Sequence, residues 1–353
     1  MIAASLSAVT QEERDAIREG PRDAETHRRL LTALPFANAL DVVAQAPSPA
    51  AEHEAALVVA WNAERCKFLD ESAAFLAAQG ADVLLLSELD WGMARSGQHH
   101  CARELASRLD CGYAYGVEFL ELDEPERSEG GERERSEFAG QRNTVGYHGN
   151  AILARGALSR PRLVRLETRG DWFDGARGEA RVGGRCAVLA QRRAGGRMTT
   201  FAALHLDSHG SPQSRAVELH VLLDAIDAYD RDAPVVIGGD LNAFSLGLAD
   251  LADPERVAAA LRDDPLRWSN PVPHEPLFAV AAEHGYAWSC CNAPGESTLR
   301  HASEAGSSRG RLKLDWFLCR GVEANAPRVV AAVGPATGRM LSDHEAIVFA
   351  MGR

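Results

Sequence analysis

Residues 234–242 read PVVIGGDLN, a short apolar run followed by two glycines, an aspartate and an asparagine. The apolar run predicts a strand. The two glycines have no side chain, so other parts of the chain or a ligand can approach the backbone closely. Asp240 and Asn242 then stand at the end of the strand, where polar groups commonly form a site. This stretch is therefore the starting point for both the fold and the function.

Other apolar runs along the chain also end in polar residues. These ends are Asn62 in VVAWN, Glu88 in LLLSE, His205 in AALHLDSH, Asp315 in KLDWF, and Asp343 and His344 in LSDHEA. Each of them taken singly is more often a turn or an edge residue. Strand ends from one pair of sheets can converge on a common rim, however, so the whole set predicts one polar site. Its many oxygen atoms and two histidines suit a hard cation and an anionic substrate.

The order of the predicted elements indicates the fold class. From Leu57 onward, about ten short apolar runs alternate with a few helical stretches, such as those around residues 66–79 and 99–110. Between Gln213 and Tyr229, apolar residues recur at helical spacing, which predicts a helix with one face packed on a sheet. Many strands with few helices predict an α/β protein in which two sheets stack face to face with helices outside.

Two segments differ from this regular pattern. Residues 1–50 are predicted to form an N-terminal helical extension that packs on the main domain, residues 51–353, and Thr10–Glu13 carry a capping-box pattern. Residues 121–141 are charged and nearly free of apolar residues, which predicts a flexible, solvated insertion. A surface loop is the simpler interpretation of this insertion. A substrate lid stays open as the alternative, because long loops are often functional.

The composition disfavours several classes of protein. With 46% hydrophobic and 25% charged residues, the chain of 353 residues is not disordered throughout. It has no run of the roughly 20 apolar residues that cross a membrane, and its first residues turn acidic before a signal-peptide core develops, so we expect a soluble, cytoplasmic protein. Seven scattered cysteines without a CxxC pair disfavour a disulfide framework. The net charge of −12 disfavours nucleic-acid binding by charge alone, although a local basic groove stays open.

Read in order, the segments WN, SE, GNAIL, HLDSH, GGDLN, LDWF and SDH resemble the endonuclease/exonuclease/phosphatase superfamily. The resemblance extends from Leu57 to the C-terminus, and GGDLN, SDH and the upstream SE are its most specific parts together. It implies that residues 51–353 form a catalytic domain with a four-layered α/β sandwich, two stacked mixed β-sheets flanked by helices. It also implies metal-dependent hydrolysis of phosphoester bonds.

A divalent cation is the cofactor that the resemblance and the residue types imply. Glu88, a carboxylate at a strand end, offers the hard oxygen ligand that Mg²⁺ or Mn²⁺ prefers, and waters and substrate oxygens complete the octahedron. Asn62 is expected either to add an amide oxygen to the same ion or to orient Glu88. Asp343 is expected to serve the metal directly or through water. Whether one or two ions act stays open.

The remaining strand-end residues are expected to take part in catalysis. Asp240 is expected to hold a nucleophilic water near phosphorus, and Asn242 to donate its amide hydrogens to a phosphoryl oxygen. By similarity to the family, His344 contacts the scissile phosphate, and Asp315 accepts its other ring hydrogen, which would raise the pKa of His344 and fix its tautomer. His205 resembles a family histidine that hydrogen-bonds a nonbridging or leaving-group oxygen.

Weaker candidates for substrate contact lie near these residues. They are Asn150 in HGNAIL, His148 two residues before it, and Ser208 beyond His205. We expect the substrate to be a phosphodiester in a small molecule, a lipid headgroup or a nucleotide, attacked in line by an activated water. A DNA or RNA nuclease of the same family is the first alternative. A non-catalytic binding protein that retains the fold is the second.

Overall fold

The computed structural model describes residues 2–3, 6–45, 56–122, 140–175, 180–194, 196–300 and 312–352. The predicted flexible insertion at residues 121–141 lies outside these residues except at its ends. The predicted domain boundary at residue 50 also lies outside them. The insertion and the boundary therefore stay predictions.

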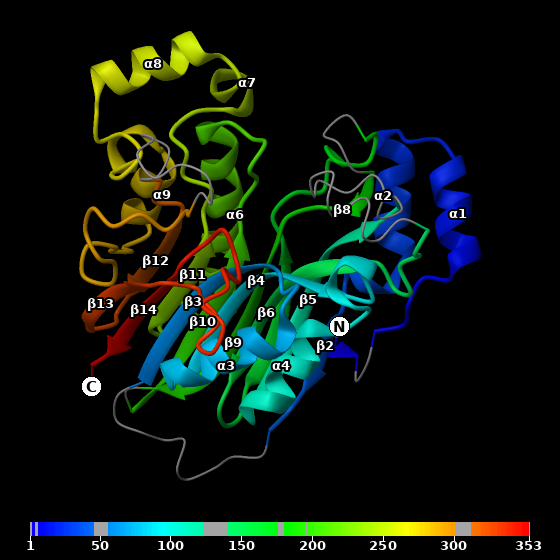
Figure 1. The fold of residues 1–353 in the computed structure, drawn as a ribbon, viewed down its shortest axis with the longest axis horizontal. Coiled ribbons are helices and arrows are strands. Elements are labelled where there is room, and N and C mark those ends of the chain that lie inside the picture. The colour runs from blue at the N-terminus through cyan, green and yellow to red at the C-terminus, as the bar shows by residue number, and fades with distance from the viewer. Residues whose placement is uncertain are drawn as a thin grey trace.

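Two β-sheets form the centre of the fold (Figure 1). In spatial order, the first sheet contains β1 (Ile2–Ala3), β2 (Leu40–Val43), β5 (Gly112–Glu121), β6 (Tyr147–Ala154), β4 (Val83–Trp91), β3 (Ala56–Arg65), β14 (Ala346–Met351) and β13 (Ala324–Val330), and β8 (Arg181–Gly183) pairs with β5. The second contains β12 (Asp315–Arg320), β11 (Val235–Asp240), β10 (Arg197–His205), β9 (Cys186–Ala194) and β7 (Ser159–Arg165). Parallel pairs, β3 with β4 and β10 with β11, stand beside antiparallel ones, so both sheets are mixed.

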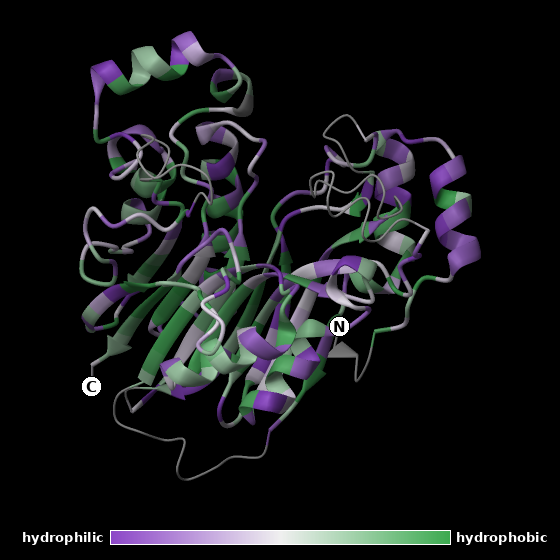
Figure 2. Cartoon of the chain, in the orientation of Figure 1, coloured by the Kyte–Doolittle hydropathy of each residue, from purple (hydrophilic) through white to green (hydrophobic). Residues whose placement is uncertain are grey.

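The sheets pack face to face because their strands are apolar on both sides. In β3, Val58 belongs to the core between the sheets, whereas Val59 belongs to the core on the outer side of the first sheet. In β11, Val236 faces the same inner core, and Ile237 faces the outer side of the second sheet. Successive strand residues point to opposite faces, so each of these strands has to be covered on both sides. Figure 2 shows the central strands as predominantly hydrophobic.

Helices cover the two outer faces of the sheets. The described helices are α1 (Gln11–Glu19), α2 (Ala24–Ala33), α3 (Leu69–Gln79), α4 (Cys101–Leu109), α6 (Pro212–Asp230), α7 (Leu248–Leu251), α8 (Pro254–Asp263) and α9 (Leu277–Glu283), with short 3-10 helices η1 (Pro35–Ala37), η3 (Ala94–Ser96) and η5 (Val272–His274). Side chains of α3 and α4 join the outer core of the first sheet, and those of α6 and α9 join that of the second. The predicted four-layered α/β sandwich is confirmed. Within the described part of the chain, no helix has the length and apolar character of a membrane span.

Helix α6 is the helix predicted between Gln213 and Tyr229. It begins after Ser211, whose side chain accepts a hydrogen bond from the backbone of Ser214 at 3.1 Å, and a proline stands in its first turn. Arg215 is fully buried in this helix and pairs with Glu275 at 2.6 Å. This ion pair ties α6 to the segment that leads into α9.

The N-terminal segment contributes both helices and the strands β1 and β2. The predicted capping box begins α1: Thr10 Oγ1 accepts a hydrogen bond from the backbone of Glu13, and Glu13 accepts one from the backbone of Thr10 at 2.8 Å. Strand β2 pairs with β5 in the first sheet. The pattern of the sequence did not indicate this strand, because LDVV is too short to show a period.

Burial of an acidic side chain on α6 gives the fold a pH-dependent stability. Glu218 is 2% exposed, and its Oε2 accepts a hydrogen bond from the backbone of Asp207 at 2.9 Å. Burial raises the pKa of Glu218 to about 8, although the Asp207 hydrogen bond opposes this shift. An acid with a raised pKa stabilises the folded state at low pH, and that contribution is lost as the pH rises through the folded value.

We therefore expect Glu218→Gln to raise the free energy of unfolding at pH 8 by on the order of 2 kcal/mol, and by much less at pH 5. Glutamine retains the acceptor for Asp207 but carries no ionisable group. Urea unfolding of both proteins at the two pH values measures the effect. Glu255→Gln, at an exposed position of α8, is the control. An equal gain at both pH values would contradict the explanation by a buried acid.

Candidate active site

The register of the second sheet places three predicted residues side by side. His205 at the end of β10 pairs with Asp240 at the end of β11, and Asp240 pairs with Asp315 at the start of β12. Strand β12 is antiparallel to the parallel pair β10 and β11, so the three residues meet at one edge of the sheet. Each of their side chains is buried.

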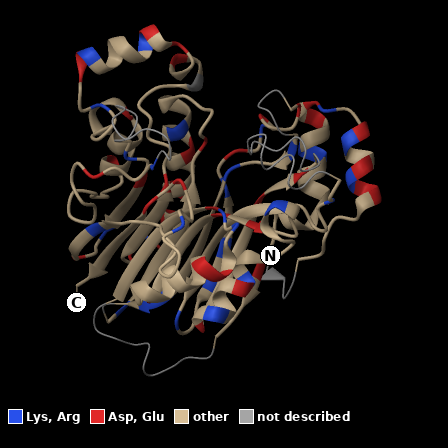
Figure 3. Cartoon of the chain, viewed as in Figure 1, with Lys and Arg blue, Asp and Glu red and all other residues tan. Residues whose placement is uncertain are grey.

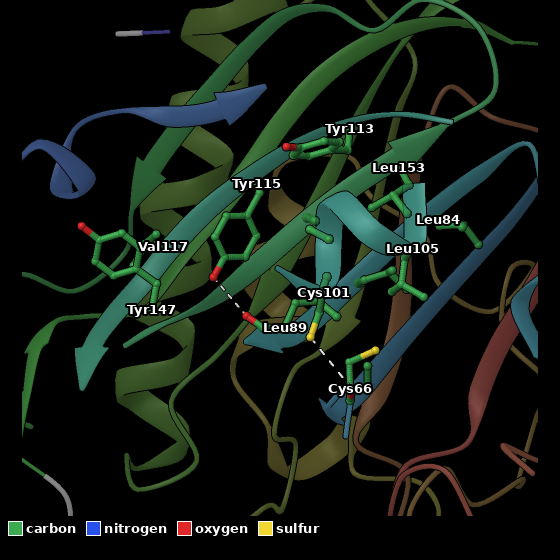
Figure 4. Close-up of a cluster of buried hydrophobic side chains, with 14 of the residues drawn as sticks. Cys66, Leu84, Leu89, Cys101, Leu105, Tyr113, Tyr115, Val117, Tyr147 and Leu153 are labelled. Carbon is green, nitrogen blue, oxygen red and sulfur yellow. Dashed lines mark hydrogen bonds between the residues drawn. The ribbon is translucent and has the colours of Figure 1, made fainter. Parts of the chain in front are cut away.

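A β-bulge aims Glu88 at the same edge. The register of β4 shifts around this residue against both of its neighbours, β3 and β6, and Glu88 has a φ of +55°. A bulge redirects a side chain, and a positive φ is strained for a residue other than glycine. The Tyr115 hydroxyl donates a hydrogen bond of 3.0 Å to the carbonyl oxygen of Leu89, the next residue (Figure 4). This bond satisfies a backbone group beside the distortion.

Asn62 connects carboxylates from the two sheets. Its Nδ2 donates hydrogen bonds to Glu88 Oε1 at 3.0 Å and to Asp240 Oδ2 at 3.1 Å. Its Oδ1 accepts a hydrogen bond of 3.1 Å from the backbone of Glu64. Because the amide oxygen is used within the chain, the geometry favours the second role considered for Asn62, that of orienting Glu88.

His344 is fixed from several directions. Its Nδ1 donates to Asp315 Oδ2 at 2.8 Å, and its Nε2 lies 3.6 Å from Asp240 Oδ2. Its carbonyl oxygen accepts a hydrogen bond from Trp61 Nε1 at 3.0 Å, and its backbone nitrogen donates to Ser342 Oγ at 2.9 Å. These contacts place the imidazole of the loop before β14 against the edge of the second sheet.

The two histidines of the site differ in charge. Burial disfavours the charged form of His344, but Asp315 and Asp240 outweigh it and hold its pKa well above the ordinary value. Burial and the charge of Arg185 hold the pKa of His205 well below the ordinary value. Burial raises the pKa of Asp240 to about 7, with His344 opposing and Asp315 reinforcing the shift. Neighbouring groups with pKa values pushed apart are typical of acid–base sites.

Arg185, which the sequence analysis missed, fixes the tautomer of His205. Its Nη1 donates to His205 Nδ1 at 2.9 Å and to Glu118 Oε2 at 3.1 Å. His205 Nδ1 is therefore an acceptor, and the ring hydrogen is on Nε2, which lies 3.5 Å from Asp240 Oδ2. The central carbon of the Arg185 guanidinium lies 5.8 Å from the centroid of the Trp172 ring. No motif marked this arginine, because its partners are far away in the sequence.

One cavity of about 410 Å³ opens among these residues. The predicted residues that line it are Glu88, His148, His205, Ser208, Asp240, Asn242, Asp343 and His344. Asn62, Asp315 and Asn150 do not line it. Asn150 instead donates to Glu118 Oε1 at 3.0 Å and to the carbonyl oxygen of Cys186 at 2.9 Å. Three arginines missed by the sequence analysis, Arg65, Arg181 and Arg185, also line the cavity.

The weaker candidates His148 and Ser208 are held by neighbouring charged groups. His148 Nδ1 lies 2.8 Å from Asp90 Oδ1, and Asp90 forms a buried ion pair with Arg95 at 2.8 Å. Ser208 Oγ accepts a long hydrogen bond of 3.5 Å from Arg185. Both side chains therefore have fixed positions at the wall of the cavity.

The carboxylates of the cavity fit a divalent cation. Burial raises the pKa of Glu88, but its interactions with His205, His148 and Arg65 and the hydrogen bond from Asn62 outweigh burial and hold the pKa below the ordinary value. Asp343 adds a second carboxylate to the cavity wall. Ionised carboxylates with amide and water oxygens are the donor set that Mg²⁺ and Mn²⁺ prefer.

The fold and the site together define the class of protein. The model of the Endonuclease/Exonuclease/phosphatase family matches residues 59–344. The chain belongs to this family, so its fold is of the metal-dependent phosphodiesterase and nuclease type. The resemblance inferred from the sequence is thereby confirmed.

Solved structures with the same fold come from bacteria and animals. An endonuclease/exonuclease/phosphatase from Beutenbergia cavernae DSM 12333 has a TM-score of 0.57 and 18% identity, with 85% of this chain and 72% of that chain covered. The human Nocturnin catalytic domain with bound sulfate has a TM-score of 0.52 and 15% identity, with 89% and 97% covered. A humanized D. rerio TDP2 has a TM-score of 0.50 and 17% identity, with 85% and 100% covered. At these identities the similarity concerns the fold. No curated protein matches the chain.

The strained backbone at Glu88 predicts how two substitutions at this position differ in stability. We expect Glu88→Gly to have a free energy of unfolding about 1 kcal/mol higher than Glu88→Ala, because glycine adopts a φ of +55° without strain. Urea unfolding of the two variants measures the difference. Ser87, the preceding residue, has no positive φ and is the matched control: Ser87→Ala should be more stable than Ser87→Gly. The same order at both positions would contradict the strain at Glu88.

Proposed function

We propose that this protein hydrolyses a phosphodiester bond in a small-molecule, lipid-headgroup or nucleotide substrate by in-line attack of water. The observation that carries this proposal is the arrangement around Asp240 Oδ2. This one oxygen lies 3.5 Å from the neutral His205 and 3.6 Å from the positively charged His344, at the wall of a cavity. A base, a hydrogen-bond donor and a cationic acid thus face the same space.

In this proposal Asp240 accepts the proton of the attacking water. Its raised pKa of about 7 makes it a stronger base than an ordinary carboxylate near neutral pH. The imidazolium of His344 donates a hydrogen bond to a phosphoryl oxygen, where negative charge develops, and Asp315 keeps it protonated. His205 donates from Nε2, and Asn242 lines the same wall. Phosphoryl transfer needs mainly such positioning and charge stabilisation.

Glu88 and Asp343 are the residues that would hold the cation, which we propose to be Mg²⁺ or Mn²⁺. Such an ion neutralises charge on the phosphoryl group and lowers the pKa of bound water. Asn62 keeps the Glu88 carboxylate in place through its hydrogen bond of 3.0 Å. Both carboxylates and Asp240 border the cavity, which is a donor set for one ion or two.

A nuclease is the alternative activity within the family. Figure 3 shows acidic and basic residues interspersed on outer helices such as α1 and α8, and the net charge is −12. This charge distribution favours a small substrate over a long polyanion, which binds through clustered cations. The three arginines that line the cavity are compatible with a short nucleic-acid end as the substrate, so this alternative is retained. A binding protein without catalysis is disfavoured because Glu88, Asp240, Asn242, Asp315 and His344 are all present and close together.

The role of His344 predicts a specific loss of activity. We expect His344→Ala to lower kcat by about two to four powers of ten, because the variant loses the imidazolium that stabilises developing charge. Hydrolysis of bis(p-nitrophenyl) phosphate with saturating Mn²⁺ measures it. His220→Ala removes an exposed histidine on α6 and should retain full activity. A loss of about tenfold or less in His344→Ala would show that His344 does not touch the reacting phosphate.

Removal of the metal tests the cation assignment. We expect EDTA to abolish turnover and Mg²⁺ or Mn²⁺ to restore it, and we expect Glu88→Gln to remain folded but to lose the stimulation by metal. Phosphomonoesters, phosphodiesters, phospholipids, plasmid and oligonucleotides should be compared side by side. Plasmid nicking with a steep dependence on salt would favour the nuclease alternative. Full activity in EDTA would contradict the metal assignment.

A further inference from the structure

The cavity that holds the proposed catalytic residues has a second, apolar wall that the proposed chemistry does not use. Between residues 244 and 314, every described residue that lines the cavity is apolar. The main members of this apolar wall are Phe244, Val257, Trp268, Leu299, Leu312 and Leu314. Apart from the indole nitrogen of Trp268, which is a buried hydrogen-bond donor, the charged and hydrogen-bonding side chains at the cavity come from other parts of the chain.

The apolar wall is separate from the cores that stabilise the sheets. Trp268, Leu299, Leu312 and Leu314 form their own cluster, with Phe244 and Val257 packed against it at partial burial. It is built from the connection between β11 and β12, which also contains α7 and α8. Helix α8 has no fully buried residue and lies beyond the ends of the strands (Figure 1). Val257 of this helix lines the cavity.

The apolar wall is joined directly to the catalytic residues. Leu314 precedes Asp315 in the sequence, and Phe244 follows Asn242 by two residues. Leu299 forms a backbone bridge with His344. If a phosphate lies between Asp240 and His344, a group esterified to it therefore reaches the apolar wall within a few bonds. Arg181 and Arg185 also line the cavity and offer positive charge to the phosphate itself.

From this juxtaposition we infer that the substrate is a small phosphoester in which one esterified group is uncharged and apolar, and that this group packs against the apolar wall. The inference rests on the proposed function and makes its substrate class specific. A cavity of about 410 Å³ accommodates one small molecule. A nucleic-acid chain would continue past the scissile phosphate and needs charged or polar partners there. Among the described residues of the apolar wall, the indole nitrogen of Trp268 is the one polar side-chain atom, and none of them carries a charge.

Binding of alkylphosphonates tests the inference without requiring turnover. Methyl-, propyl- and hexylphosphonate carry the same charged head on apolar chains of increasing length. Burial of one methylene strengthens binding up to about fourfold, so we expect hexylphosphonate to bind at least about tenfold more tightly than methylphosphonate. Isothermal calorimetry of the full chain in Mn²⁺ measures the dissociation constants. Equal constants for the three ligands would overturn the inference.

A matched pair of variants tests where the alkyl chain of the ligand binds. Val257→Asn places a polar group on the apolar wall, at a half-buried position of α8, and should reduce the ratio of methyl- to hexylphosphonate dissociation constants by about fourfold or more. Val217→Asn makes the same change at a position of α6 that is 60% exposed, and should leave the ratio unchanged. If the ratio were equally large in the wild type and in Val257→Asn, the alkyl chain would not pack against the apolar wall at Val257. An oligonucleotide that binds more tightly than hexylphosphonate would overturn the substrate class.

The same ligand series separates this inference from the proposed function. Alkyl p-nitrophenyl phosphates of the same chain lengths report on hydrolysis. If none is hydrolysed while the phosphonates bind in order of chain length, the proposed hydrolysis fails and the apolar subsite is supported. If all are hydrolysed while the phosphonates bind equally, the hydrolysis is supported and the apolar subsite is overturned.

Discussion

The close approach of backbone and side chains around strand β11 is the constraint on which the site depends. A Cβ atom at Gly238 would lie 2.8 Å from a side-chain carbon of Leu85 in the facing sheet, and one at Gly239 would lie 2.0 Å from the carbonyl oxygen of Leu204. At Gly239 the short distance is to backbone, so only glycine fits there, whereas a Cβ atom at Gly238 would require the side chain of Leu85 to shift. With glycine present, β11 packs between its neighbours, and Asp240 follows at the level of His205 and Asp315. A displacement of this strand would separate the three residues.

Burial at this edge, together with neighbouring charges, shifts the pKa values of the two histidines in opposite directions. The carboxylates of Asp315 and Asp240 favour the charged form of His344. Burial and the guanidinium of Arg185 disfavour the charged form of His205. The positions of these partners, rather than the types of the residues, produce the difference. Strain is concentrated here as well: Glu88 and Asn242 both have a positive φ, and both line the cavity. Such strain persists where the surrounding structure holds it, as the hydrogen bonds of Asn62 and Tyr115 do at Glu88.

The two walls of the cavity have different origins in the chain. The polar wall comes mainly from strand ends of the two sheets and the loops beside them, and these are the segments that mark the family. The apolar wall comes from the connection between β11 and β12, which lies outside the strands of the two sheets. This division is typical of folds that host many substrates, since loops vary while the scaffold keeps the chemistry in place. The family fold therefore supports the reaction type, and the connection supports the inferred substrate class.

Much of the fold follows from local patterns in the sequence. The strands β10 and β11 are apolar runs that end at His205 and Asp240, and the spacing of leucines predicted α6. The apolar runs of β3 and β4 were also predicted, but these strands continue beyond Asn62 and Glu88. Strand β2 was missed because its pairing with β5, rather than any local pattern, makes it a strand. Strand β8 has only three residues, and it too is defined by its pairing with β5.

The sequence by itself determined that His205 and Asp240 stand at strand ends, because strand periodicity and the positions of glycine and polar residues are local properties. Asn62 and Glu88, expected at strand ends as well, lie within β3 and β4, where register shifts interrupt the pairing. Tertiary structure alone decided which of those residues share a cavity. It placed Asn150 behind the cavity against Glu118 and brought Arg185 to His205. It also gathered the apolar wall from residues as far apart as Phe244 and Leu314. Contacts between distant segments depend on strand register and sheet packing, and neither is visible in the local pattern of the chain.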